Sequence, residues 1–266
     1  SGQELDIVVP SLKIAIEFNG VYWHSSRFRD ANYHLDKLEE CRGLGLRLLQ
    51  VWEDDWRDRR PQVEEHIKQL LGTSNLPRVH ARKTNPRIIS RGDAQEFLDR
   101  THIQGWVASS QYVGLFAEDS LVAVASFKYQ GDDLYLTRYA TAALVRGGHS
   151  KIIRWVEQNL TYSNLVTFAD LTFSEGDLYK STGWLQDKTL PPDYMYVIRN
   201  SREHKFKYRK KKFETDPKLK YVPGMTERQL AELNGLLRIY DAGKIRFIKP
   251  HPILVRDIDP KEKEQA

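Results

Sequence analysis

Residues 4–24 read ELDIVVPSLKIAIEFNGVYWH, and this stretch decides the fold of the N-terminal part of the chain. Its first apolar run, 7–9, enters the turn pair Pro10-Ser11, and the β-branched run IAIEF follows at once, which predicts two antiparallel strands joined by a tight turn. Each strand carries an acid: Asp6 heads the first, and Glu17 lies inside the second. Because an unpaired carboxylate is expensive to bury, both acids are expected to have a partner.

Two acids on adjacent strands can bind a hard divalent cation through oxygen, so Asp6 and Glu17 are candidate metal ligands. His24 follows the glycine turn at Gly20 and is placed to move protons at a metal-bound water. A simpler alternative stays open, because strand ends often carry acids and His24 can pack on Trp23.

Three motifs, D-I-V-V-P, E-F-N-G-V-Y-W-H and L-L-Q-V-W-E-D-D-W, resemble the very-short-patch-repair (Vsr) branch of the PD-(D/E)XK nucleases. The similarity is strongest to the Vsr-like domain of phage homing endonucleases. It implies that Asp6 and Glu17 bind the metal and that His24 acts as general base or orients the attacking water. Where the general motif has a lysine, this chain has Asn19, and the resemblance makes Lys37 the candidate for that role.

Further polar residues flank this candidate site. A helix predicted over 32–42 places His34 and Lys37 on one face, and a strand over 46–52 ends in three acids. By resemblance, possible supporting residues are Glu4, Asn19, His34, Glu53 and Asp54. A solvated helix face, and capping of a helix predicted over 61–71, are the alternatives.

The charge of the chain is concentrated near its C-terminus. The net charge is +5, but residues 199–266 hold 18 Lys and Arg against 10 Asp and Glu. The densest basic segment, 199–220, interleaves aromatic residues, a composition suited to phosphates and bases. A solvated helix face or a localisation tract is the alternative. The candidate DNA-binding residues are Lys205, Lys207, Arg209, Lys210, Lys211 and Lys212.

One cysteine excludes an internal disulfide, and no apolar run approaches the roughly 18 to 20 residues of a membrane span. A soluble, intracellular protein without a membrane partner is expected, in the host cytoplasm if the chain is phage-encoded. The sequence does not specify the oligomeric state.

The middle of the chain, after a linker at 72–77, predicts a helix, a strand meander, a glycine-opened helix and a further strand. This order, with FADLTFSEGDLYKSTGW and PPDYMYV, resembles the GNAT acetyltransferase fold and, more closely, the GNAT-like module of phage homing endonucleases. A glycine loop can hold an acyl-CoA diphosphate at a helix N-terminus, which makes Arg146, Gly147 and Gly148 a candidate acyl-CoA loop. Their spacing departs from the family's R-x-x-G-x-[GA], so acetyl-CoA is not expected as a cofactor.

The fold class predicted from these patterns is α/β (α+β). A Vsr-like PD-(D/E)XK nuclease core is expected over residues 1–75, a GNAT-like mixed-sheet domain over 78–200 and a basic C-terminal DNA-binding extension over 201–266. Within the extension, a helix from Thr226 and a hairpin turned at 241–243 are predicted.

The predicted function is that of a homing-endonuclease-like enzyme that hydrolyses phosphodiester bonds in double-stranded DNA. Its cofactor is expected to be Mg²⁺, with Mn²⁺ as an alternative. Two other functions stay open: a GNAT-like acyltransferase that modifies DNA and has a degenerate nuclease domain, and a DNA-binding protein without activity.

Overall fold

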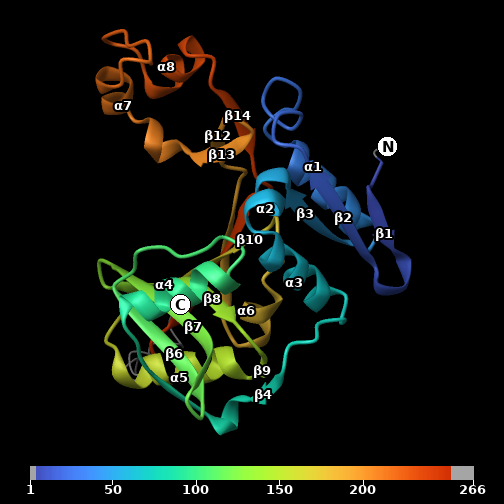
Figure 1. Cartoon of the computed structure of the whole chain (residues 1–266), viewed down its shortest axis with the longest axis vertical. Helices are drawn as coiled ribbons and strands as arrows, with labels where there is room; N and C mark the ends of the chain where they lie inside the picture. Colours follow the sequence, from blue (N-terminus) through green and yellow to red (C-terminus); the bar gives the residue numbers. More distant parts are fainter. Residues whose placement is uncertain (1–3, 253–266) are drawn as a thin grey trace, which may run out of the picture. The chain divides into compact units, whose positions relative to one another are not determined.

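The computed structural model describes residues 4–252, which form two compact units (Figure 1). The first unit joins residues 4–60, 170–175 and 189–244. The second unit joins residues 61–169, 176–188 and 245–252. Each unit is assembled from separate stretches of sequence. The three consecutive domain ranges expected from the sequence stay a prediction.

The N-terminal sheet of the first unit has the strand order β1-β2-β3. Strands β1 (Ile7–Val9) and β2 (Ile14–Asn19) are antiparallel, as predicted, and a 3-10 turn that begins at Pro10 joins them. Strand β3 (Arg47–Trp52) runs parallel to β2 and is reached through helix α1 (Tyr33–Gly43). This crossover brings residues of α1 to the sheet beside the acid of β2.

The rest of the first unit begins with helix α2 (Glu53–Asp58) and adds a three-stranded antiparallel sheet in the order β13-β12-β14. Its remaining elements are β12 (Tyr194–Ile198), β13 (Ser201–His204), the 3-10 helix η3 (Lys205–Tyr208), α7 (Lys210–Thr215), α8 (Glu227–Leu233) and β14 (Leu237–Tyr240). Thr226 and Gln229 form a capping box at α8, which explains why this helix starts where the sequence predicts. A small apolar core that includes Tyr196 and Phe213 holds these elements together.

The second unit is built on a mixed seven-stranded sheet in the order β11-β15-β10-β8-β7-β6-β5. An antiparallel meander forms one side, namely β5 (Thr84–Ile88), β6 (Gln111–Ala117), β7 (Ser120–Gln130) and β8 (Asp133–Thr141). The other strands are β10 (Asn164–Asp170), β11 (Leu185–Leu190) and β15 (Lys244–Pro250). Strand β10 is parallel to β8, so the direction of pairing changes at this point of the sheet.

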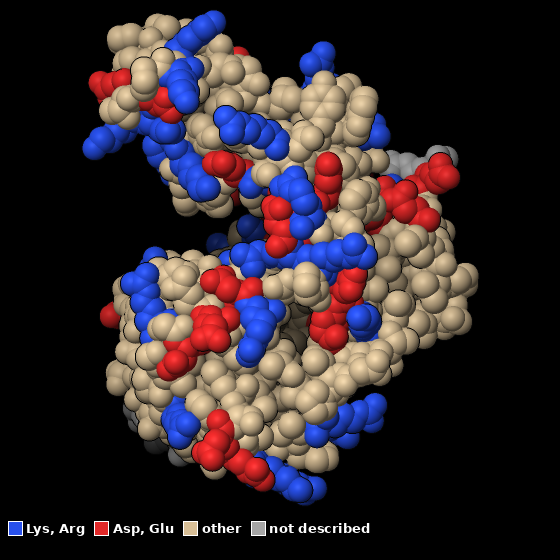
Figure 2. All heavy atoms as spheres, viewed as in Figure 1, with Lys and Arg blue, Asp and Glu red and all other residues tan. Residues whose placement is uncertain are grey.

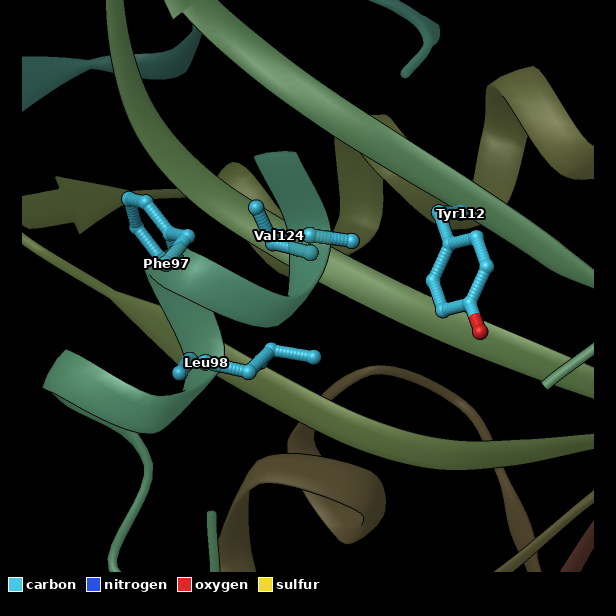
Figure 3. Close-up of a cluster of buried hydrophobic side chains, with 6 residues drawn as sticks. Phe97, Leu98, Tyr112 and Val124 are labelled. Atoms are coloured by element: carbon cyan, nitrogen blue, oxygen red, sulfur yellow. The ribbon is translucent and has the colours of Figure 1, made fainter. Parts of the chain in front are cut away.

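Helices and two short strands complete the second unit: α3 (Arg60–Leu70), β4 (Arg78–His80), η2 (Ala81–Lys83), α4 (Arg91–Thr101), β9 (Leu144–Arg146), α5 (Gly148–Asn159) and α6 (Asp177–Ser181). Helix α4 packs on the meander. Its Phe97 and Leu98 belong to one buried apolar cluster with Tyr112 of β6 and Val124 of β7 (Figure 3).

The predicted hairpin at 241–243 is wrong. Strand β14 pairs with β12 in the small sheet, whereas β15 lies between β11 and β10 in the seven-stranded sheet. The turn residues are suited to a hairpin, but tertiary pairing sends the two strands into different sheets. The mixed α/β class is confirmed, and a Vsr-like nuclease core is not shown. Across residues 4–252, no helix is long and apolar enough to cross a membrane.

Candidate functional site

The structure contains two candidate sites, and the first lies at the N-terminal sheet, where the sequence predicts one. Glu17 of β2 is 6% exposed and forms an ion pair with Lys37, which α1 brings to the sheet and which is 4% exposed. The Lys37 ammonium also donates a hydrogen bond of 2.9 Å to the backbone carbonyl of Glu4. Glu17 and Lys37 therefore lie together in a buried ion pair, and their predicted roles in catalysis stay predictions.

Asp6 has a different environment. It is exposed, and its Oδ2 accepts a hydrogen bond of 2.7 Å from the backbone N–H of Phe18, which ties the two strands together. Throughout residues 4–252, no three His, Cys, Asp or Glu side chains gather in a way that could hold a metal ion. The observed contacts of Asp6 and Glu17 are thus those of strand pairing and charge neutralisation.

The predicted histidines come together beside this ion pair. The rings of His24 and His34 stack with centroids 5.1 Å apart, and His34 Nδ1 lies 2.7 Å from Gln50 Oε1. Burial, together with the charge of Arg29, lowers the pKa of His24 to about 4. Burial, together with neighbouring His24, lowers the pKa of His34 to about 3. Both imidazoles are therefore neutral at pH 7.

The other predicted supporting residues are held by different contacts. Asn19 is fully buried, and its amide lies 3.4 Å from Gln50 Oε1. Glu53 Oε2 accepts a hydrogen bond of 2.9 Å from the backbone of Val21. Asp54 forms a salt bridge of 2.9 Å with Arg202 of β13. The last two acids therefore stabilise the first unit by linking its segments.

The basic residues predicted to bind DNA lie on η3, α7 and the residue between them. Four of the six form ion pairs with nearby acids, at Lys205, Lys207, Arg209 and Lys212. Lys210 and Lys211 are exposed. Figure 2 shows Lys and Arg side chains over this part of the surface with acids among them, so the positive charge is partly balanced locally.

The second candidate site lies where strands β8 and β10 part. Their parallel register covers two residue pairs, Leu134 with Leu165 and Tyr135 with Val166. At the next position, Thr167 Oγ1 donates to the carbonyl of Leu136 at 3.1 Å, so a side chain rather than the β10 backbone satisfies this group. Where two parallel strands stop pairing in the middle of a sheet, backbone groups are no longer taken up by the neighbouring strand, and a change of pairing direction is a common place for a ligand to bind.

Three aromatic side chains and a histidine surround this parting. The Tyr179 hydroxyl from α6 lies 3.3 Å from Thr167 Oγ1. The ring of His149, in the first turn of α5, is 5.8 Å from that of Tyr179, 6.0 Å from that of Trp184 and 5.3 Å from that of Tyr139. Burial raises the pKa of Tyr179, so its hydroxyl keeps its proton at pH 7.

His149 is the most unusual member of this group. It is 3% exposed, yet neither ring nitrogen has a hydrogen-bond partner within residues 4–252. Burial, with a smaller effect of Lys249, lowers its pKa to about 4. A buried polar group without a partner is costly, and a bound ligand is one way in which such a group gains a partner.

The lowered pKa of His149 should be visible in how the free energy of unfolding depends on pH. Between pH 6.5 and about 4 the unfolded chain binds a proton at His149 that the folded chain does not, so stability falls as the pH is lowered through this window. Lowering the pH from 7 to 5 should therefore cost about 2 kcal/mol at this residue. Urea unfolding at both pH values should show this loss in the wild type and a loss smaller by about that amount in His149→Phe. Replacing the exposed His80 with Asn is the control, and an equal pH dependence in all three proteins would contradict the assignment.

The predicted acyl-CoA loop has a packing role. Gly147 caps α5 with a left-handed φ of +79°, and a Cβ on Gly148 would come within 2.8 Å of Val145 Cγ1. Lys151, one turn into α5, donates to the carbonyl oxygens of Ala81 and Thr84. Residues 81–84 thus lie against the first turn of α5, where a diphosphate was predicted.

Sequence reasoning missed Tyr179, His149 and Thr167 as functional candidates. Two of them lie in or next to motifs that carry the resemblance to the GNAT fold: His149 follows the glycine pair, and Tyr179 is the tyrosine of DLYKSTGW. Thr167 carries no local signal, because its role depends on where β8 and β10 separate.

No protein-family model and no curated protein matches the chain. Among solved structures, a Bacillus subtilis acetyltransferase in complex with CoA is 11% identical, covers 63% of this chain and 99% of its own, and has a TM-score of 0.37. The ribosomal-protein-S18-alanine N-acetyltransferase of Escherichia coli is 13% identical over 63% and 94% of the two chains, with a TM-score of 0.37. A GNAT family acetyltransferase from Elizabethkingia anophelis with acetyl-CoA bound is 14% identical over 63% and 98%, with a TM-score of 0.35. At these identities and TM-scores, the likenesses assign neither a family nor an activity to this chain.

The prediction of a magnesium-dependent DNA endonuclease is wrong. The solved structures named above are acetyltransferases and not DNA hydrolases, and no metal-binding group is present in the described part of the chain. The Mg²⁺ and Mn²⁺ predictions are wrong for the same reasons, whereas the roles of the individual residues Asp6, Glu17, His24 and Lys37 stay predictions. The expectation against acetyl-CoA is corrected too, since two of these three structures are complexes with CoA or acetyl-CoA. The GNAT-like sheet domain is confirmed in outline by the mixed seven-stranded sheet.

Proposed function

We propose that this chain is a GNAT-like acyltransferase that uses acyl-CoA and modifies DNA. The observation that carries the proposal is the Tyr179 hydroxyl at the point where β8 and β10 part. Parallel strands that separate expose backbone groups which an extended, amide-containing chain can pair with, as a peptide does when it adds to a sheet edge. The unpartnered nitrogens of His149 beside this point are a second feature that fits a ligand.

The residues at the parting suit acyl transfer. Acyl-CoA supplies an acyl group bound to sulfur as a thioester. When an acceptor amine forms a bond to the acyl carbon and the carbon–sulfur bond breaks, the thiolate needs a proton and the amine loses one. Tyr179 is protonated at pH 7 and would donate to the sulfur, and neutral His149 would accept a proton in the same cluster. Thr167 would orient the Tyr179 hydroxyl.

DNA is proposed as the acceptor because of the basic C-terminal part. Residues 199–266 carry 18 Lys and Arg, and phosphate binding by such residues supplies most nonspecific affinity for DNA. Lys210 and Lys211 are exposed and available for phosphate contacts. The N-terminal sheet takes no part in the chemistry of this proposal.

The test is transfer of labelled acetyl groups from acetyl-CoA to DNA by the full chain. Tyr179→Phe removes the proton donor, so the rate should fall about a hundredfold while acetyl-CoA binding, measured by calorimetry, stays close to that of the wild type. Tyr129→Phe is the matched control, because its hydroxyl bonds the Thr161 carbonyl in the same unit. Equal rates in Tyr179→Phe and wild type would contradict the role of Tyr179.

A DNA-binding protein without transferase activity is the second candidate. It is favoured by the packing of residues 81–84 on the first turn of α5, where the glycine pair could otherwise meet a diphosphate. DNA binding without any heat signal from acetyl-CoA would support this candidate over the acyltransferase.

A further inference from the structure

The first unit contains a pocket of about 450 Å³ among β12, β13, η3 and the start of α8. Its lining includes the aromatic side chains Tyr194, Tyr196, Phe206 and Tyr208. Tyr196 and Tyr208 are buried, whereas Phe206 is 60% exposed. A large aromatic side chain that is exposed beside buried aromatic partners offers a flat face to a planar ligand.

Two cations and an imidazole already lie on these rings. The guanidinium carbon of Arg209 is 4.4 Å from the centroid of the Phe206 ring, and the Lys205 ammonium is 4.9 Å from that of Tyr194. The ring of His204 is 4.5 Å from that of Phe206. These contacts show that the rings of this pocket suit planar and cationic partners, and the exposed part of Phe206 leaves ring surface for a further one.

We propose that this pocket binds an unpaired nucleobase, with Phe206 as the stacking platform and Arg209 and Lys205 toward the adjoining phosphate. The proposal rests on the nucleic-acid-binding part of the proposed function and is independent of acyl transfer. In a duplex the faces of the bases are covered by their neighbours, so a pocket floored by aromatic rings selects a base that is not stacked.

Two acids in the pocket lining also favour a base over a phosphate inside the pocket. Asp193 and Glu227 are paired with Lys205 and Arg209 and would repel a phosphate placed inside the pocket. A carboxylate does accept hydrogen bonds from the exocyclic amino groups of bases. The charges therefore favour a nucleobase inside the pocket and the sugar–phosphate backbone of the nucleic acid outside it.

The experiment measures fluorescence anisotropy with three probes of one sequence: a 12-nucleotide single-stranded DNA, the same strand as RNA, and the fully paired DNA duplex. Phe206→Ala should weaken single-strand binding about 5- to 150-fold, the range found for loss of one base stack, and should leave duplex binding nearly unchanged. Phe206→Trp should retain single-strand binding. The DNA and RNA arms identify which nucleic acid supplies the unpaired base.

Two variants are the controls. Tyr221→Ala removes an exposed aromatic residue outside the pocket lining and should change no affinity. Lys211→Gln removes an exposed charge and should weaken single-stranded and duplex DNA alike. Equal losses for both forms of DNA in Phe206→Ala, or no loss at all, overturn the proposal. Duplex binding by a wild type that does not bind single strands overturns it while the DNA-binding part of the proposed function stands.

Discussion

Replacing Glu17 with alanine is expected to lower the free energy of unfolding by about 3–5 kcal/mol, because it leaves a buried lysine without its counter-ion. Lys37 is 4% exposed, and within residues 4–252 its ammonium also donates to the Glu4 carbonyl, which cannot neutralise a charge. The loss should appear in urea unfolding at pH 7. The double variant Glu17→Leu/Lys37→Met removes both charges and should lose less than Glu17→Ala does.

The control for this prediction lies on the same helix as Lys37. Glu39→Ala breaks the salt bridge of 2.5 Å with Arg42, but the Glu39 side chain is 55% exposed, so the loss should be no more than about 1 kcal/mol. A Glu17→Ala protein as stable as the wild type, or more stable, would contradict the structural role. Such a result would indicate a carboxylate that is kept for function at a cost in stability.

The sequence predicted the elements that carry this pair but not the pair itself. The spacing of Asp6 and Glu17 predicted acids on adjacent strands, whereas helical spacing put Lys37 only on one face with His34, and the resemblance alone placed that face at the site. A buried acid next to a lysine is equally compatible with an ion pair and with a catalytic site. Residue type and spacing cannot separate them, because the difference depends on which further groups approach.

The course of the chain between the sheets could not be predicted from local signals. Asp241-Ala242-Gly243 has the composition of a hairpin turn, and Gly243 does adopt a φ of +86°. A Cβ on Gly243 would lie 2.5 Å from the Leu190 carbonyl oxygen. The glycine is therefore needed for a close backbone approach to a residue more than fifty positions earlier, a contact that only the tertiary structure reveals.

The candidate acyl-transfer site could not be predicted from local sequence signals either. Thr167, Tyr179 and His149 come from a strand and two helices. The Thr167 and Tyr179 hydroxyls meet, with the His149 ring beside them, at the point where β8 and β10 stop pairing after two residue pairs. The sequence predicted the strands and the helices separately. The point where parallel pairing stops has no marker of its own, since no glycine or proline interrupts either strand there.

Replacing Gly176 with alanine is expected to destabilise the second unit by about 2–5 kcal/mol and to disturb the candidate site. Gly176 has a φ of +79°, a conformation that costs an L-residue roughly 1–2 kcal/mol. Its new Cβ would also lie 2.5 Å from two ring carbons of Phe247, which is fully buried. That ring is 5.2 Å from the ring of Tyr179, so relief of the clash would move a residue of the proposed active site.

Gly131→Ala separates the cost of the backbone conformation from the cost of the clash with Phe247. Gly131 also has a positive φ, of +60°, but a Cβ there meets no atom within 4 Å, so this variant carries the backbone cost of roughly 1–2 kcal/mol without the clash. Thermal or urea unfolding should therefore rank Gly176→Ala well below Gly131→Ala in stability. Phe247→Leu added to Gly176→Ala removes the clashing ring carbons and should reduce the extra loss. Equal losses in the two alanine variants would mean that Phe247 moves aside without cost, and would contradict a rigid aromatic wall behind Tyr179.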